Sequence, residues 1–185
     1  MRLESYLNPS MARSFANGTH ERELASCALR NLWHIVFDPC PSLLQLASPD
    51  GKTIMEPFLV WAEDKNLTMS WSMHIHLLNW MEHTQSHGIK IADETKRELV
   101  VASAIRWAAG NMIDAKNLSH LAILIRSKSL NGYIVGARKA ATADGDLEVK
   151  LLQGGGSSEA SGSDEYALVS VPTGWEHGEW KPIPV

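Results

Sequence analysis

The chain has 185 residues, of which 44% are hydrophobic and 21% are charged, and its formal net charge is −4. This length is typical of one domain, and this composition predicts a folded protein rather than a disordered one. The slightly acidic balance argues against the basic surface that nucleic-acid-binding and membrane-surface proteins carry. No apolar run reaches the ~18 residues that a membrane-spanning helix needs.

The polar segment 1–18, which Pro9 and Gly18 interrupt, predicts an N-terminal arm. It resembles neither a signal peptide nor a transit peptide. Two cysteines, Cys27 and Cys40, are too few for a disulfide framework, and we expect both thiols to be reduced and buried. These features predict an intracellular protein of the cytoplasm or nucleus.

Helical periodicity predicts about four helices over residues 19–113. We expect Thr19 to cap the first helix and the segment Asp38-Pro39-Cys40-Pro41 to end it. Pro57 is expected in the first turn of the second helix, where proline is favoured. The third helix is expected from Ser70 to His87, and Asp93 is expected to cap the fourth.

The pattern changes to β-rich segments near residue 120. The dipeptide Asn131-Gly132 lies between two such segments and favours a tight hairpin, and Asp144-Gly145 repeats this signal. Alternation of apolar and polar residues predicts further strands over 147–152 and 166–171. Residues 114–128 fit either a strand or a helix, and the sequence leaves this choice open.

These elements predict an α+β fold in which an N-terminal bundle of about four helices is followed by an antiparallel β-meander of three or four strands. One domain is expected over residues 19–172, with its sheet over about 120–172. Within it, the Gly/Ser-rich segment 154–163 predicts a flexible loop. The irregular segment 173–185 predicts a C-terminal tail that carries two tryptophans.

Four of the eight histidines lie within the third predicted helix. On a helix, His76, His83 and His87 share one stripe, and the last two have the spacing at which two imidazoles can bind one metal ion. Zinc is the ion that such a site would take, although no glutamate stands between the histidines as in zinc proteases. The alternatives are a polar flank beside a buried stripe and a surface that gains charge on acidification. No other cofactor is expected.

Two large aromatic residues, Trp175 and Trp180, follow the last predicted strand in a segment without regular periodicity. Their rings are expected either to fold back over the same molecule or to dock on another subunit, since tryptophan is enriched at interface hot spots. Together with Tyr166, they predict a partner-binding surface.

Basic residues lie around the first predicted hairpin, namely Arg126, Lys128, Arg138 and Lys139. Such residues usually solvate and protect a sheet edge. A weak RNA-binding face is the alternative, but apart from Tyr133 the hairpin lacks the aromatic residues on which bases stack. Nucleic acid is therefore not the expected partner.

The sequence contains no nucleophile elbow and no phosphate-binding loop, so that no catalytic residue is assigned. It favours a non-enzymatic interaction or assembly protein that engages copies of itself or a protein partner through a sheet edge and the Trp-bearing tail. Small viral structural proteins and accessory subunits fit this profile. The alternatives are a metal-dependent enzyme or metal-binding regulator that uses the histidines, and a weak nucleic-acid-associated protein. No membrane contact is expected.

Overall fold

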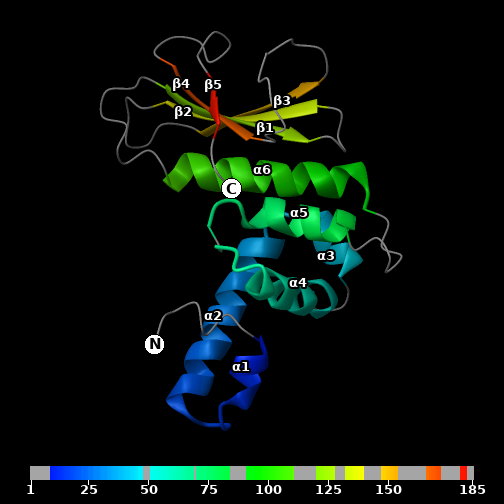
Figure 1. Cartoon of the computed structure of the whole chain (residues 1–185), viewed down its shortest axis with the longest axis vertical. Coiled ribbons are helices and arrows are strands. Elements are labelled where there is room, and N and C mark those ends of the chain that lie inside the picture. The colour runs from blue at the N-terminus through cyan, green and yellow to red at the C-terminus, as the bar shows by residue number, and fades with distance from the viewer. Residues whose placement is uncertain are drawn as a thin grey trace. The chain divides into compact units, whose positions relative to one another are not determined.

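The computed structural model describes the backbone of residues 9–47, 51–68, 70–83, 91–110, 120–127, 132–139, 147–153, 166–171 and 180–182 (Figure 1). Side chains are described within residues 12–107 of these ranges. The chain divides into two units. The first comprises Met1–Met69 and His76–Glu98, and the second comprises Ser70–Ile75 and Leu99–Val185.

Helices α1 (Pro9–Ser14) and α2 (His20–Phe37) open the first unit and contact each other (Figure 1). The predicted cap of α2 is confirmed, because the Thr19 hydroxyl accepts a hydrogen bond of 3.3 Å from the N–H of Arg22. The predicted arm over 1–18 contains the short helix Pro9–Ser14. Ala12 within it is buried.

Helix α3 (Pro41–Leu46) is followed by α4 (Lys52–Asp64), and Gly51 caps α4 with a φ of +75°. A Cβ atom at Gly51 would lie 2.6 Å from Cε2 of Phe37, so that both the backbone angle and the close packing require glycine here. The prediction that Pro57 lies in the first turn is wrong. The helix begins five residues earlier, and Pro57 lies inside it.

Helix α5 (Met73–His83) begins later than predicted, and residues 84–90 lie outside the described part of the chain. Eight of its eleven residues are buried. Helix α6 (Asp93–Gly110) begins at Asp93, which was predicted as the cap just before it, and Asp93 and Glu94 lie in its first turn. Within the first unit, the ring of Trp80 on α5 lies 6.0 Å from that of Phe58 on α4, which joins these two helices in one core.

The backbone of the second unit forms strands β1 (His120–Ser127), β2 (Gly132–Lys139), β3 (Leu147–Gln153), β4 (Tyr166–Val171) and β5 (Trp180–Pro182). All described pairings are antiparallel, and the strand order is β3-β2-β1-β4-β5. Gly132 pairs with Ser127 and therefore opens β2 instead of forming part of a two-residue turn. The predicted loop at 154–163 lies outside the described residues.

The predicted α+β fold with a β-meander is wrong. The part of the chain that is described with its side chains is a helical fold without a strand. The strand backbone that follows is not ordered as a meander, because β4 pairs with β1 and not with β3, the strand that precedes it. Residues 180–182, which lie in the predicted Trp-bearing C-terminal tail 173–185, pair with β4. None of the described helices has the length and hydropathy to cross a membrane.

Candidate functional site

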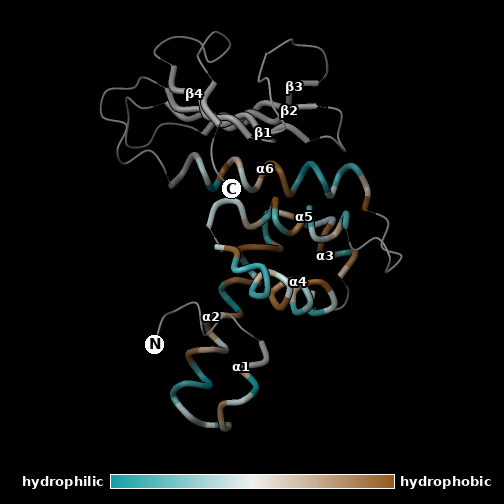
Figure 2. The backbone as a smooth tube through the Cα atoms, viewed as in Figure 1, coloured by the Kyte–Doolittle hydropathy of each residue, from teal (hydrophilic) through white to brown (hydrophobic). Residues whose placement is uncertain are grey.

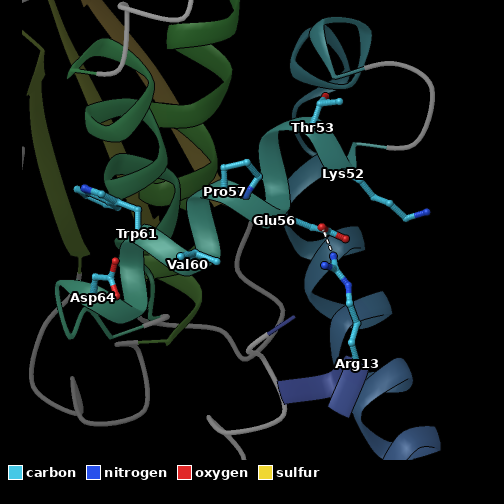
Figure 3. A pocket seen from close by; sticks show the side chains of 8 residues that line it. All are labelled: Arg13, Lys52, Thr53, Glu56, Pro57, Val60, Trp61 and Asp64. Carbon is cyan, nitrogen blue, oxygen red and sulfur yellow. Dashed lines mark hydrogen bonds and ion pairs between the residues drawn. The ribbon is translucent and has the colours of Figure 1, made fainter. Parts of the chain in front are cut away.

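An open groove of about 660 Å³ runs along α4 in the first unit (Figure 3). Seven of its lining residues belong to α4, and the eighth comes from α1. The groove is lined by Arg13, Lys52, Thr53, Glu56, Pro57, Val60, Trp61 and Asp64.

Helix α4 has a core side and a solvent side, and the groove follows the solvent side, where its apolar lining residues are Pro57, Val60 and Trp61. Its core side carries the buried residues Ile54, Met55, Phe58, Leu59 and Ala62. The stripe Thr53, Pro57, Val60 and Asp64 has helical spacing and lies on the opposite side. Apolar and polar residues alternate along the helix accordingly (Figure 2). Val60 is 42% exposed, so that this stripe leaves a β-branched apolar side chain in water.

An ion pair from a neighbouring helix forms one wall of the groove. The guanidinium of Arg13 on α1 donates to the carboxylate of Glu56 on α4 (Figure 3). This hydrogen bond and the charge of Glu56 raise the pKa of Arg13. The pair is largely exposed, so it positions the wall more than it stabilises the fold.

The ring of Trp61 lines the groove and also contacts the core. It stacks against Phe58 with ring centroids 6.1 Å apart. Because Phe58 is fully buried, this contact restrains the indole ring that an occupant of the groove would meet.

Pro57 places a backbone acceptor in the groove. In an α-helix the carbonyl oxygen of Thr53 would accept from the N–H of residue 57, but proline has no N–H. Thr53 and Pro57 both line the groove. The Thr53 carbonyl therefore lacks its usual partner within the helix and is available to a donor that enters.

Opposite charges lie toward the two ends of the groove. Lys52 is the first residue of α4 and Asp64 is the last. At 1.5 Å per residue, these positions are about 18 Å apart along the helix axis. The lining side chains include no histidine and no cysteine. The groove therefore combines an apolar centre with charges at its two ends, and pockets of this composition bind ligands through both kinds of contact.

A second polar cluster lies where α3 meets α6 in the first unit. The hydroxyl and the N–H of Ser42 both donate to one carboxylate oxygen of Glu98, at 2.6 and 3.0 Å. The hydroxyls of Ser42 and Thr95 are 2.8 Å apart. Burial and, to a lesser extent, the charge of Glu98 raise the pKa of Cys40 to about 12. This thiol stays protonated at neutral pH, which makes it a poor nucleophile.

Residues 9–184 match a protein family described as methanobactin biosynthesis cassette protein MbnC-like. The chain belongs to the MbnC-like family. The match includes every residue that lines the groove. This membership replaces the prediction of a viral structural protein. No curated protein matches the chain.

The histidines predicted as metal ligands lie in different environments in this MbnC-like chain. His76 is buried, which lowers its pKa and favours the neutral ring. His83 is exposed, and its Nδ1–H donates to the carbonyl oxygen of Asn79 at 2.6 Å. Among the described residues, no group of three His, Cys, Asp or Glu side chains could hold a metal ion. His87 lies outside them, so that the three-histidine site stays a prediction.

The remaining predicted site residues of the MbnC-like chain lie on the strands or outside the described residues. The backbone of Trp180 pairs with Val169, and that of Tyr166 pairs with Ile125. Trp175 and Lys128 lie outside the described residues.

The basic residues of the predicted RNA-binding face are spread along the hairpin. Arg126 pairs with Tyr133, whereas Arg138 pairs with Leu121 and Lys139 pairs with His120. Leu121, the partner of Arg138, is five residues from Arg126 along β1, which corresponds to about 17 Å. The register thus places Arg126 toward one end of the hairpin and the other two toward the opposite end.

Two features of the structure were missed at the level of sequence. The groove was not predicted. Its signal in the sequence is the helical spacing of Thr53, Pro57, Val60 and Asp64, together with a proline inside the helix.

Cys27 was predicted to be buried and is exposed, whereas the predicted burial of Cys40 is confirmed. The apolar stripe of α2 lies on its other side, so that Cys27 faces solvent.

Proposed function

We propose that this MbnC-like chain is a non-catalytic binding subunit of a methanobactin biosynthesis cassette, and that it holds another protein of the same cassette. A biosynthesis cassette encodes several proteins that act on one product. Within such a set, a subunit that binds without catalysing needs a surface that another protein covers. The groove on α4 is the candidate for that surface.

The observation that supports this proposal is the pair of exposed apolar residues Pro57 and Val60 on the solvent side of α4. The core side of α4 already supplies the burial that holds the helix in the fold. Pro57 and Val60 add apolar surface that the fold itself does not use. Burying a valine side chain contributes about 1.5 kcal/mol or more, so that covering this pair favours association.

A second contact remains a prediction from the sequence. It comprises an edge of the strands and the segment that holds Trp175 and Trp180. An intracellular location is also part of the proposal, and it is supported by the two cysteines, Cys27 and Cys40, which are both free thiols.

The test is to co-express the chain with each of the other proteins of its own cassette. We expect one of them to co-purify and to form a complex of defined stoichiometry, measured by gel filtration with light scattering. The cassette's chemical conversion, followed by mass spectrometry, should not occur with this chain alone. The proposal would be contradicted if none of these proteins forms a complex with the chain, or if the isolated chain carries out the conversion.

A further inference from the structure

We propose that the solvent side of α2 is a contact between two copies of this chain, in which α2 of one copy packs antiparallel against α2 of the other. The proposal commits to a second copy as the occupant. It uses a different surface from the α4 groove, and it does not depend on the proposed function. The exposed side chains that carry it, which we call the α2 face, are Glu23, Leu24, Cys27, Arg30, His34 and Ile35.

The α2 face has an apolar flank. Cys27 lies near the middle of α2 and is exposed. At about 100° per residue, Leu24 and Ile35 both lie on one side of Cys27, by about 60° and 80°. These two side chains are 42% and 37% exposed. Large apolar side chains that share one exposed flank of a helix are typical of a surface that another molecule covers.

The other flank of the α2 face carries charged groups in a definite order. Glu23, Arg30 and His34 lie about 40°, 60° and 20° to the other side of Cys27. The acidic group is therefore toward the start of the helix and the basic groups are toward its end. Neither Glu23 nor Arg30 takes part in an ion pair within the described part of the chain. These two charges match those of a second copy only when the two helices run in opposite directions.

One antiparallel register satisfies both flanks at once. A two-fold axis between the helices keeps the two apolar flanks together on one side and the two charged flanks together on the other. With that axis between positions 27 and 28, Glu23 is about level with position 32 of the second copy, between its Arg30 and its His34. Leu24 is about level with position 31 on the apolar flank, one turn from Ile35 of the second copy. The two copies of Cys27 then lie next to each other.

The direction of the helices distinguishes this arrangement from a parallel one. In a parallel pair related by a two-fold axis, Glu23 would lie beside Glu23 and Arg30 beside Arg30, and such like-charge pairs are unfavourable. The contact involves one helix of 18 residues from each copy, about 27 Å long. Because this is smaller than a standard interface, we expect a dissociation constant of about 10–100 μM.

The first test is sedimentation velocity of the full chain in reducing buffer, at concentrations up to about 200 μM. We expect a monomer–dimer equilibrium. L24D should weaken the dimer at least about tenfold, because it places a carboxylate in the apolar contact of both copies. L46D is the matched control, since Leu46 on α3 is 41% exposed and lies outside the α2 face. It should change the dissociation constant less than about twofold.

Charge exchange tests the register. E23R should weaken the dimer about tenfold, because two new arginines would face Arg30 and His34 of the opposite copy. The double variant E23R/R30E restores opposite charges across the contact and should return the dissociation constant to within about threefold of the original. A loss of stability by E23R alone would not be reversed in this way. Circular dichroism of each variant provides the control for folding.

Disulfide trapping tests the position of the axis. Diamide should join Cys27 of the two copies, and the reagent takes up the two electrons and two protons that the thiols lose. We expect a dimer on a non-reducing gel that is absent for Cys27→Ser, because Cys40 is buried. L24D should lower its yield, and L46D should not.

Four results would overturn the inference. They are a monomer at the highest concentration, equal dimers of L24D and L46D, a double variant no tighter than E23R, and no trapped dimer. A monomer that loses its cassette complex through L24D would assign the α2 face to that other protein instead. These experiments use the chain alone. A monomer that still forms the cassette complex therefore contradicts this inference and leaves the proposed function standing.

Discussion

The backbone N–H and the hydroxyl of Ser42 donate to the same carboxylate oxygen of Glu98. Ser42 lies in the first turn of α3, where the N–H groups have no partner within the helix. A carboxylate that is 56 residues away in the chain thus caps this helix. The contact stabilises α3 and connects it to α6.

Replacing Glu98 with alanine should lower the free energy of unfolding by about 2–3 kcal/mol. Two donors would lose a charged acceptor in a partly buried place, and hydrogen bonds to charged groups are the strongest of their kind. Urea denaturation measures the effect. Glu94→Ala, at an exposed position in the first turn of the same helix, is the control and should cost less than about 1 kcal/mol. Equal effects of the two variants would mean that the Ser42 contact contributes nothing.

Replacing Gly51 with alanine should destabilise the chain more than replacing Gly18 does. Both glycines have positive φ angles, +75° and +80°, and each substitution therefore carries the same backbone penalty of about 1 kcal/mol. Only at Gly51 would the Cβ also meet Phe37 and Trp33, at 2.6 and 2.8 Å, whereas nothing lies within 4 Å at Gly18. The two melting temperatures, compared under the same conditions, isolate this steric effect. A smaller loss for Gly51→Ala would show that the packing around Phe37 yields without cost.

Pro57→Ala should raise the free energy of unfolding, by up to about 3 kcal/mol. Pro57 lies inside α4, and alanine there restores the N–H that pairs with the Thr53 carbonyl and removes the clash of the proline ring. Urea denaturation measures the change. An unchanged or lowered free energy of unfolding would show that proline costs the helix nothing at this position.

The two thiols should differ in reactivity in the native protein. A thiol reagent at pH 8 should modify the exposed Cys27 faster than the protein unfolds and leave the buried Cys40 unmodified. Cys27→Ser should therefore show no fast-reacting thiol until the protein is denatured. Fast modification of that variant in the native state would contradict the buried position of Cys40.

The raised pKa of Cys40 also predicts how stability depends on pH. The folded state holds the proton up to about pH 12, whereas the unfolded thiol ionises near its ordinary value of 9.0. The contribution is fully present below pH 9.0 and is lost between these two values, by up to about 1.4 kcal/mol per pH unit. Urea denaturation at pH 8 and pH 10 should show a steeper loss for the unmodified chain than for Cys40→Ala. Parallel losses would assign the pH dependence to other groups.

Local chemistry explains the predictions that succeeded. The cap at Thr19, the end of α2 near Asp38-Pro39 and the start of α6 at Asp93 depend on hydrogen bonds and dihedral angles within a few residues. The same local reasoning gave the wrong position for Pro57, which lies inside α4 and not in its first turn. A helix interior tolerates proline when burial of the neighbouring core side outweighs the lost hydrogen bond, and burial is not a local property.

Alternation of apolar and polar residues indicates a strand but not its neighbours. Nothing in the segments at β3 and β4 specifies that β4 pairs with β1. The order of the strands is therefore a property of the assembled sheet. It differs from the predicted meander, in which each strand pairs with the next strand in the sequence.

The sequence by itself determined the helix caps, the helix ends and the amphipathic spacing of α4, because these follow from contacts between residues close in the chain. Only the tertiary structure decided which side of α4 faces the core, that Arg13 on α1 pairs with Glu56, and that Glu98 reaches Ser42. Apolar residues occur on both sides of α4, and the elements that pack against the helix cover Phe58 and leave Val60 exposed. The groove is the side that this packing left in water.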